Sequence, residues 1–108
     1  MSYYDAYNAD LKFAQFNGSR WNTDTVASNF SQGLYTNLLI DSGGGDDIVY
    51  YNKTQDAVFR ATGSIGNWTV GALVSDGGRH VFYARYGNSK RVISYYQASS
   101  DDLLTTTF

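Results

Sequence analysis

Two tryptophans, an arginine and two tyrosines are the side chains of this sequence whose chemistry points to a binding site. Trp21 and Trp68 offer flat ring faces on which a sugar ring can stack, while Tyr51 and Tyr96 combine an aromatic ring with a hydroxyl. Arg60 can donate several hydrogen bonds to an anionic or hydroxyl-rich ligand. These five residues are the candidate ligand-binding residues of this sequence.

Each candidate also has a structural alternative. A tryptophan that opens an outer strand can cover the edge of a sheet. Alternation along a strand sends one ring of a tyrosine pair into the interface between sheets and the other to the opposite face. Arg60 can pair with Asp56 or Asp46 in place of a ligand.

Catalysis and metal binding have little support. His80 is the only histidine, and spacing ties no nucleophile or acid to it. Asp41, Asp46 and Asp47 bracket three glycines and offer hard oxygens for calcium, but they lack the spacing of a known calcium loop, which favours a solvated hairpin turn. The absence of glutamate counts against a glycosidase with paired carboxylates. The sequence therefore predicts no enzyme, no cofactor and no metal.

Composition narrows the class of protein. With 108 residues the chain is long enough for one domain. A net charge of −2 without a basic run argues against nucleic acid as a partner, and no apolar stretch approaches the length of a transmembrane helix. The chain has no cysteine, which leaves the compartment open. No signal peptide is recognisable before Ser2, so we expect a mature start or a protein that stays inside the cell.

A repeat organises the whole chain. A pair of adjacent tyrosines occurs three times, 47 and then 45 residues apart: Tyr3-Tyr4, Tyr50-Tyr51 and Tyr95-Tyr96. With the offset of 47, Leu11 falls on Val58 and Trp21 on Trp68. The two-residue difference is expected in the turn-rich stretch from Asp76 to Gly78. A period in this range is typical of β-propellers and stacked arrays, in which each unit buries its apolar face against copies of itself.

Alternating apolar residues, interrupted by glycine and asparagine, predict ten short strands. They span Ser2 to Tyr4, Leu11 to Phe16, Trp21 to Ala27, Leu34 to Asp41, Asp47 to Tyr51, Ala57 to Thr62, Trp68 to Val74, His80 to Tyr86, Val92 to Tyr96 and Leu103 to Thr107. Four strands per repeat match one propeller blade. The strand order predicts a partial blade over residues 1–28, a blade over 34–74 and a partial blade over 79–108.

The predicted fold is therefore all-β, a β-propeller segment of about 2.3 four-stranded blades. Propellers have about 4 to 8 blades, so one chain cannot close the ring. Free strand edges and uncovered apolar faces would invite pairing with another chain. We expect a homo-oligomer, a dimer or trimer, that completes one ring. A single small β-sandwich is the alternative.

Several motifs resemble blades of the fungal and bacterial fucose-binding propeller lectins. Ile48 to Tyr51 are followed by Val58 and then by Gly66-Asn67-Trp68. The first unit, with Ser2 to Asp5 followed by Asp10 to Ala14, is even more similar to a tandem blade repeat of secreted bacterial propeller proteins. The resemblance covers essentially the whole chain. It implies a propeller fold, sugar sites between adjacent blades and an extracellular protein.

In those lectins the sugar is held by an arginine, a glutamate and a tryptophan, and only the tryptophan has a counterpart here. The arginine position falls on Ser2, Val49 and Ser94, and the glutamate position on Phe13, Arg60 and Thr105. These residues cannot make the charged hydrogen bonds of the family site. The predicted function is a glycan-binding, lectin-like oligomer with several shallow sites between blades. The alternative is a non-catalytic structural module that assembles with itself and has no specific ligand.

Overall fold

The computed structural model describes residues 1–29, 31–41, 43–87 and 89–108. The described residues form ten β-strands and no helix, so none of them belongs to a helix that could span a membrane. In chain order the strands are β1 (Ser2–Asp5), β2 (Asp10–Phe16), β3 (Trp21–Ala27), β4 (Leu34–Ile40), β5 (Asp46–Asn52), β6 (Ala57–Ser64), β7 (Asn67–Ser75), β8 (Arg79–Tyr86), β9 (Lys90–Gln97) and β10 (Asp102–Thr107).

All ten strands predicted from the sequence are confirmed, with ends that differ from the predicted ones by at most two residues. The strands form three antiparallel sheets with the orders β1-β2-β3, β4-β5-β6-β7 and β10-β9-β8, and none of the sheets is closed. We call them the N-terminal, central and C-terminal sheets. Within each sheet, strands that are consecutive in the sequence pair with one another, because short turns join them. The predicted all-β class is confirmed.

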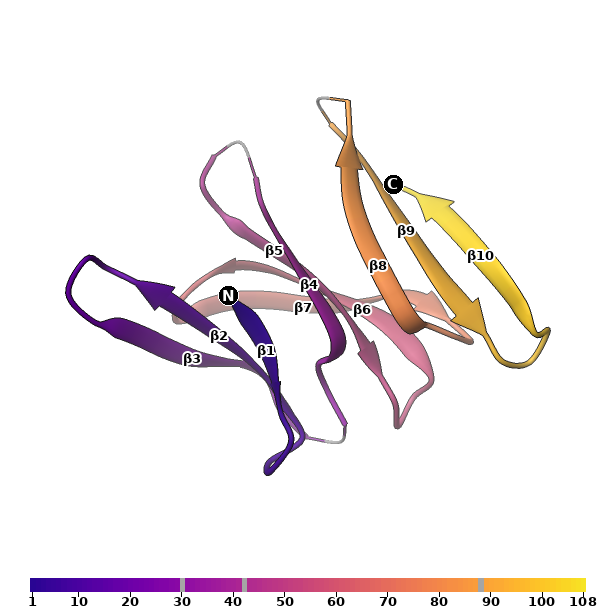
Figure 1. Ribbon diagram of the computed structural model, residues 1–108, viewed down its shortest axis with the longest axis horizontal. Coiled ribbons are helices and arrows are strands. Elements are labelled where there is room, and N and C mark those ends of the chain that lie inside the picture. Colours follow the sequence, from indigo (N-terminus) through magenta and orange to yellow (C-terminus); the bar gives the residue numbers. More distant parts are fainter. Residues whose placement is uncertain (30, 42, 88) are drawn as a thin grey trace.

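The three sheets follow one another along the molecule (Figure 1). The N-terminal sheet, in indigo and purple, lies at one end and the C-terminal sheet, in orange and yellow, at the other. The central sheet lies between them, and its strand β4 contacts both β1 and β8. The molecule measures 47 × 36 × 18 Å. Each end sheet therefore has a neighbouring sheet on one side only.

Strand β5 is the centre of the hydrophobic core. All seven of its residues, Asp46–Asn52, are buried. Because neighbouring side chains point to opposite faces of a strand, Ile48 and Tyr50 pack against the N-terminal sheet while Val49 and Tyr51 pack against the C-terminal sheet. The predicted separation of the two tyrosine rings onto opposite faces is confirmed for this pair.

The sequence repeat is also a repeat of strand register. The second tyrosine of each pair stands opposite the residue seven positions later, as Tyr4 opposite Leu11, Tyr51 opposite Val58 and Tyr96 opposite Leu103. In the N-terminal and central sheets a further strand pairs with the strand that holds this later residue. Its register shifts immediately after that residue, between Leu11 and Lys12 and between Val58 and Phe59. Equivalent residues therefore place equivalent bulges, which twist and bend the strands in the same way.

Left-handed backbone recurs at the same spacing. Three residues in the turns after the tyrosine pairs have φ of 58, 50 and 58°, namely Ala9, Asp56 and Asp101. Asn29 and Asp76, 47 positions apart, have φ of 70 and 67°, and Tyr35 and His80, 45 positions apart, have φ of 52 and 56°. The offset changes between Asp76 and His80. This confirms the predicted position of the two-residue difference.

Candidate functional site

The interface between the central and C-terminal sheets holds a buried carboxylate with three donors around it. Arg60 Nε and Nη2 donate to Asp47 Oδ1 and Oδ2, both at 2.9 Å, and the Tyr83 hydroxyl donates to Oδ2 at 2.8 Å. Arg91 Nε lies 2.9 Å from the same Oδ2 without forming a hydrogen bond, so this contact is a charge interaction. Two arginines and one tyrosine thus balance one carboxylate that is 1% exposed.

The surroundings of Asp47 keep it ionised. Burial alone would raise the pKa of its carboxyl, but the hydrogen bonds from Arg60 and Tyr83 and the charges of Arg60 and Arg91 outweigh burial and hold the pKa below its usual value. The Arg60 guanidinium also lies 5.1 Å from the centre of the Phe108 ring, which stacks on Tyr83. The cluster therefore joins the two sheets through charge and aromatic contacts.

The predicted partners of Arg60, Asp56 and Asp46, are wrong, because the arginine pairs with Asp47. In the register of β5 and β6, Arg60 stands opposite Val49. Asp47 is two residues from Val49 and shares its face of the strand, whereas Asp46 points to the opposite face. The Arg60 side chain is still 31% exposed, so it can meet solvent beside this ion pair.

Trp68 joins the central sheet to the N-terminal sheet. Its indole Nε1 donates to Asp24 Oδ2 at 2.8 Å, and the Gly66 backbone N–H donates to the same oxygen at 2.7 Å. The hydrogen bond from Gly66 lowers the pKa of the Asp24 carboxyl, and the hydrogen bond from Trp68 adds to this effect. Burial acts in the opposite direction but is outweighed. The ring of Trp68 meets Phe13 edge-on, with centroids 5.2 Å apart. Trp68 thus connects two neighbouring sheets.

Trp21 occupies the same repeat position in the N-terminal sheet but has a different environment. It is 58% exposed, and its aromatic neighbour is Phe16 of the same sheet, at 5.4 Å between ring centroids. Phe16 is itself 52% exposed. Two aromatic side chains therefore form an open surface at this end of the molecule.

The two tyrosines among the candidate residues make the same local contact. The Tyr51 hydroxyl donates to Asp56 Oδ1 and the Tyr96 hydroxyl to Asp101 Oδ1, each at 2.6 Å. Burial and the Asp56 carboxylate raise the pKa of the Tyr51 hydroxyl, while nearby Arg79 acts in the opposite direction. Each tyrosine hydroxyl therefore forms a hydrogen bond with the residue of left-handed conformation in the turn after its own strand, which stabilises that turn.

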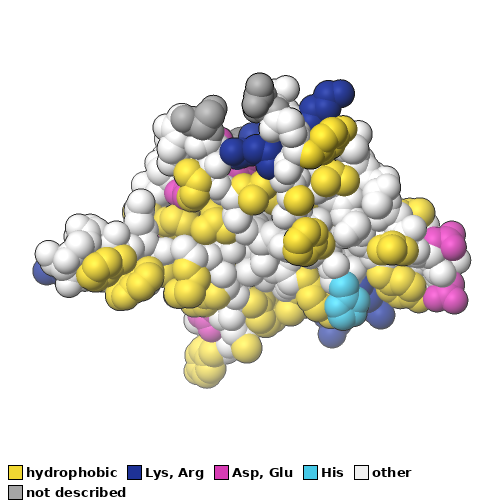
Figure 2. All heavy atoms as spheres, turned by 45° about the horizontal axis from the view of Figure 1, so that its top comes forward, with side chains coloured by type: hydrophobic (Ala, Val, Ile, Leu, Met, Phe, Trp, Pro, Cys, Tyr) yellow, Lys and Arg dark blue, Asp and Glu magenta, His cyan; other side chains and the backbone are white. Residues whose placement is uncertain are grey.

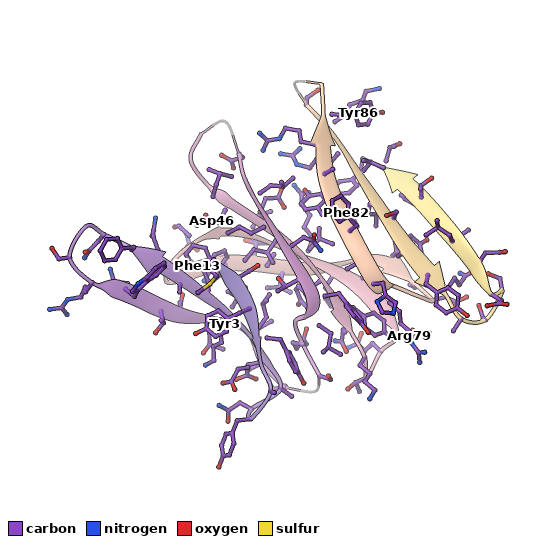
Figure 3. The ribbon with its side chains drawn as sticks, viewed as in Figure 1. Tyr3, Phe13, Asp46, Arg79, Phe82 and Tyr86 are labelled. Atoms are coloured by element: carbon purple, nitrogen blue, oxygen red, sulfur yellow. The ribbon has the colours of Figure 1, made fainter. Side chains whose placement is uncertain are left out.

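Tyr51 also lines a hollow between the central and C-terminal sheets. This hollow has a volume of about 310 Å³, at the lower end of the range of about 300–1,000 Å³ for small-molecule sites. Its walls are Leu34, Tyr35, Tyr51, Lys53, Arg79 and His80. The Tyr35 ring lies 4.5 Å from the His80 ring and 6.1 Å from the Tyr51 ring, centroid to centroid. Arg79 stands where β8 begins (Figure 3).

A second hollow of about 250 Å³ lies beside Arg60, against strands β6 and β7. Its lining is mostly small and polar, with Thr62, Thr69 and Gly71 among its residues. The only ionisable side chain in its lining is Arg60, whose two hydrogen bonds go to Asp47. This hollow therefore offers fewer free polar groups than the first.

The acidic run beside the three glycines is a turn that binds its own backbone. Asp41 Oδ1 accepts hydrogen bonds from the N–H groups of Gly43 and Gly45, both at 2.8 Å. Asp46 and Asp47 point to opposite faces of β5. Within the described ranges of the chain, no three histidine or acidic side chains gather as a metal site would require.

Sequence reasoning missed the hollow at Tyr51. It selected Tyr51 but not Tyr35, Lys53 or Arg79, and it considered His80 only as a catalytic base. No local signal marks these residues, because they come from three strands and a turn that only the packing of two sheets brings together. Asp24, the partner of Trp68, was also missed, since the repeat places glycine at its equivalent position.

The five candidate residues therefore do not come together in one site. Of the five, Tyr51 lines the larger hollow and Arg60 the smaller. Scans against protein-family models, curated proteins and solved structures found no match for this chain.

Proposed function

We propose that this protein is an assembly module that packs side by side with further copies of itself to build a β-propeller ring. The observation that carries the proposal is the unequal burial of equivalent residues. Leu11 and Val58 are fully buried, whereas Leu103, at the same repeat position, is 76% exposed. The same position is therefore covered in two units and open in the third.

The chain's own interfaces supply the reason for this difference. A Cβ added at Gly33, just before β4, would lie 2.8 Å from Leu11 Cα, and one added at Gly78, just before β8, would lie 2.6 Å from Val58 Cγ2. The segment that enters each following sheet thus covers this position. The C-terminal sheet has no such neighbour, so a further sheet placed there would cover Leu103 in the same way.

The opposite end of the molecule offers a matching surface. Trp68 of the central sheet reaches back to Phe13 and Asp24 of the sheet before it, and Trp21, its equivalent, has no sheet to reach. On β10 the alternate residues Leu103 and Thr105 are exposed. In a head-to-tail assembly Trp21 of one copy would therefore lie against β10 of the next, which continues the interfaces already formed inside the chain.

The number of sheets favours two copies. The described residues of each chain form three sheets, so a dimer would contain six such sheets, within the range of about 4 to 8 blades for propellers. Three copies would contain nine. The resemblance to propeller lectins supports the same architecture, and ring closure covers the apolar faces of the two end sheets, which would otherwise invite unspecific association.

The first test measures the mass of the assembly by light scattering or native mass spectrometry. The parent protein is expected at about twice the chain mass of 12.0 kDa. Leu103→Asp should shift it to the monomer, because a carboxylate cannot be buried without a partner. Tyr86→Asp is the matched control. Tyr86 is also exposed, and its repeat equivalent is Asp41, so the fold accepts an aspartate there.

Two results would contradict the assembly proposal. One is a parent protein that is monomeric up to about millimolar concentration. The other is loss of assembly in Tyr86→Asp to the same degree as in Leu103→Asp, since that would indicate unspecific association of exposed apolar groups.

Carbohydrate recognition is a second candidate function, and the hollow at Tyr51 favours it. Aromatic rings and several hydrogen-bond donors line one concave surface between two sheets, which is the composition of many small-molecule sites. Glycan-array binding by the parent protein tests it. Trp68→Ala and Trp21→Ala, in the same assay, separate this hollow from a site built on the tryptophans, because neither tryptophan lines the hollow.

A further inference from the structure

The hollow at Tyr51 is unusual in this acidic protein because cations line it. Lys53 and Arg79 are both exposed, and His80 lies beside them. In Figure 2 the single histidine, in cyan, adjoins Lys or Arg side chains in dark blue and hydrophobic side chains in yellow. Among the described residues, the carboxylate that bonds to the lining is Asp56, which accepts the Tyr51 hydrogen bond. The two cations therefore exceed the nearby negative charge.

The repeat provides an internal comparison for this hollow. At the junction between the N-terminal and central sheets, the repeat equivalent of Tyr51 is Tyr4, and the repeat equivalent of His80 is Tyr35. This first junction has Ala6 at the position of Lys53 and Leu34 at the position of Arg79. The same fold therefore forms a junction that has no cation at either of these two positions.

Backbone geometry directs two aromatic rings into the same hollow. Tyr35 and His80 have φ of 52 and 56°, a left-handed conformation that is unfavourable for a bulky residue. Each lies at a register shift where its strand begins, and a bulge of this kind redirects a side chain. As a result, Tyr35 is 42% exposed with its ring against His80. An open ring stands beside two cations.

We propose that this hollow binds an acidic sugar, a pyranose ring that carries a carboxylate or sulfate group. The Tyr35 ring offers the stacking surface for the sugar, and Arg79 and Lys53 bind the anionic group by charge-assisted hydrogen bonds. The inference rests on carbohydrate recognition, the second proposed function, and names its ligand class. It does not depend on assembly, because one chain supplies every residue of the hollow.

The test uses ligands that differ in one feature. Methyl glucuronide and methyl glucoside share the ring and differ in the carboxylate, glucose 6-sulfate carries a sulfate instead, and inorganic sulfate is an anion without a ring. Titrations followed by amide NMR report both affinity and position. At least one acidic sugar is expected to bind with a dissociation constant on the order of 1 mM, at least tenfold tighter than the glucoside or inorganic sulfate, with shifts at Tyr35, Lys53 and His80.

Variants copied from the first junction are expected to keep the fold intact. Lys53→Ala with Arg79→Leu introduces the residues that the repeat already holds at these positions, and it should weaken binding of the acidic sugar at least tenfold. The control, Arg20→Ala with Lys90→Ala, removes the same charge from exposed residues outside the hollow. Its affinity should equal that of the parent, which separates a local site from a general effect of net charge.

Each other outcome overturns the inference in a distinct way. Equal binding of inorganic sulfate and the acidic sugars would leave an anion site without sugar recognition. Equal binding of glucoside and glucuronide would retain carbohydrate recognition but remove the acidic class. Absence of binding by every sugar would remove both, and the mass measurement of assembly would be unaffected. Equal loss in the two double variants would place binding outside the hollow.

Discussion

Asp46 and Asp47 are adjacent in the chain and both buried, yet their surroundings act on them in opposite directions. Burial raises the pKa of the Asp46 carboxyl, and the negative charge of Asp41 acts in the same direction. The positive charge of the N-terminal amino group opposes this increase but does not cancel it. For Asp47 the hydrogen bonds and charges of its arginine and tyrosine partners outweigh burial and lower the pKa. One carboxylate is therefore held by its partners, and the other is buried without a cation paired to it among the described contacts.

These two residues give a paired prediction for stability. Asp47→Asn should lower the free energy of unfolding at pH 7 by about 2–4 kcal/mol, because it leaves two partly buried arginines without their counter-charge. Asp46→Asn should raise it by a few tenths to about 1 kcal/mol, because it removes a buried charge. Urea unfolding of both variants measures the difference. The exposed control Asp102→Asn should stay within about 0.5 kcal/mol of the parent.

The two effects differ in their dependence on pH. The stability that Asp47 contributes is present above the unfolded pKa of about 3.9 and is lost as the pH falls through its lower folded pKa. The contribution of Asp46 is complete below the unfolded pKa and is lost as the pH rises through its raised folded pKa. Both variants should therefore differ less from the parent at pH 3 than at pH 7. Differences that are independent of pH would contradict the assignment.

At the scale of elements, the sheets are held at a fixed distance by glycines that precede β4 and β8. Gly78 has φ of 137°, and a Cβ there would lie 2.6 Å from Val58 and 2.8 Å from Tyr51. Gly33 makes the equivalent approach to Leu11. The path from one sheet to the next thus depends on a missing side chain.

Gly78→Ala should therefore lower the free energy of unfolding by about 1–3 kcal/mol. Gly71→Ala is the matched control, because Gly71 lies in β7 with no atom within 4 Å of an added Cβ and without a positive φ. It should be neutral or slightly stabilising, since glycine weakens a strand. Thermal or urea unfolding compares the two. Equal losses of stability in the two variants would contradict the explanation that the close approach of Gly78 to Val58 and Tyr51 excludes a side chain there.

The elements themselves could be predicted from the sequence, because each of their signals is local. Alternating residues such as those from Ile48 to Tyr51, and turn residues such as Asn17-Gly18, set the strands and their connections. The hollow could not be predicted, because Lys53, Arg79 and Tyr35 meet only through the packing of two sheets. The true partner of Arg60 required the strand register, which composition alone does not give.

At the scale of the whole molecule, the two end sheets expose residues whose repeat equivalents contact a neighbouring sheet inside the chain. Trp21 provides a spectroscopic probe of one of them, because it is 58% exposed. Assembly in the proposed order should cover it, so tryptophan emission should shift to shorter wavelength as the protein concentration rises. The variant Trp21→Phe should show no such shift, since Trp68 already lies between two sheets. A shift that persists in Trp21→Phe would mean that a different surface is buried.

The difference between the two junctions has a consequence for valency. Lys53 falls on Ala6 in the first unit and, with the offset of 45, on Ala98 in the third, so each copy carries the cationic hollow once. Rotation about the axis of a two-copy ring would set two such hollows on the same rim, half a turn apart. An acidic polysaccharide long enough to span them would bind both at once, and the second contact would benefit from the high effective concentration that the first creates.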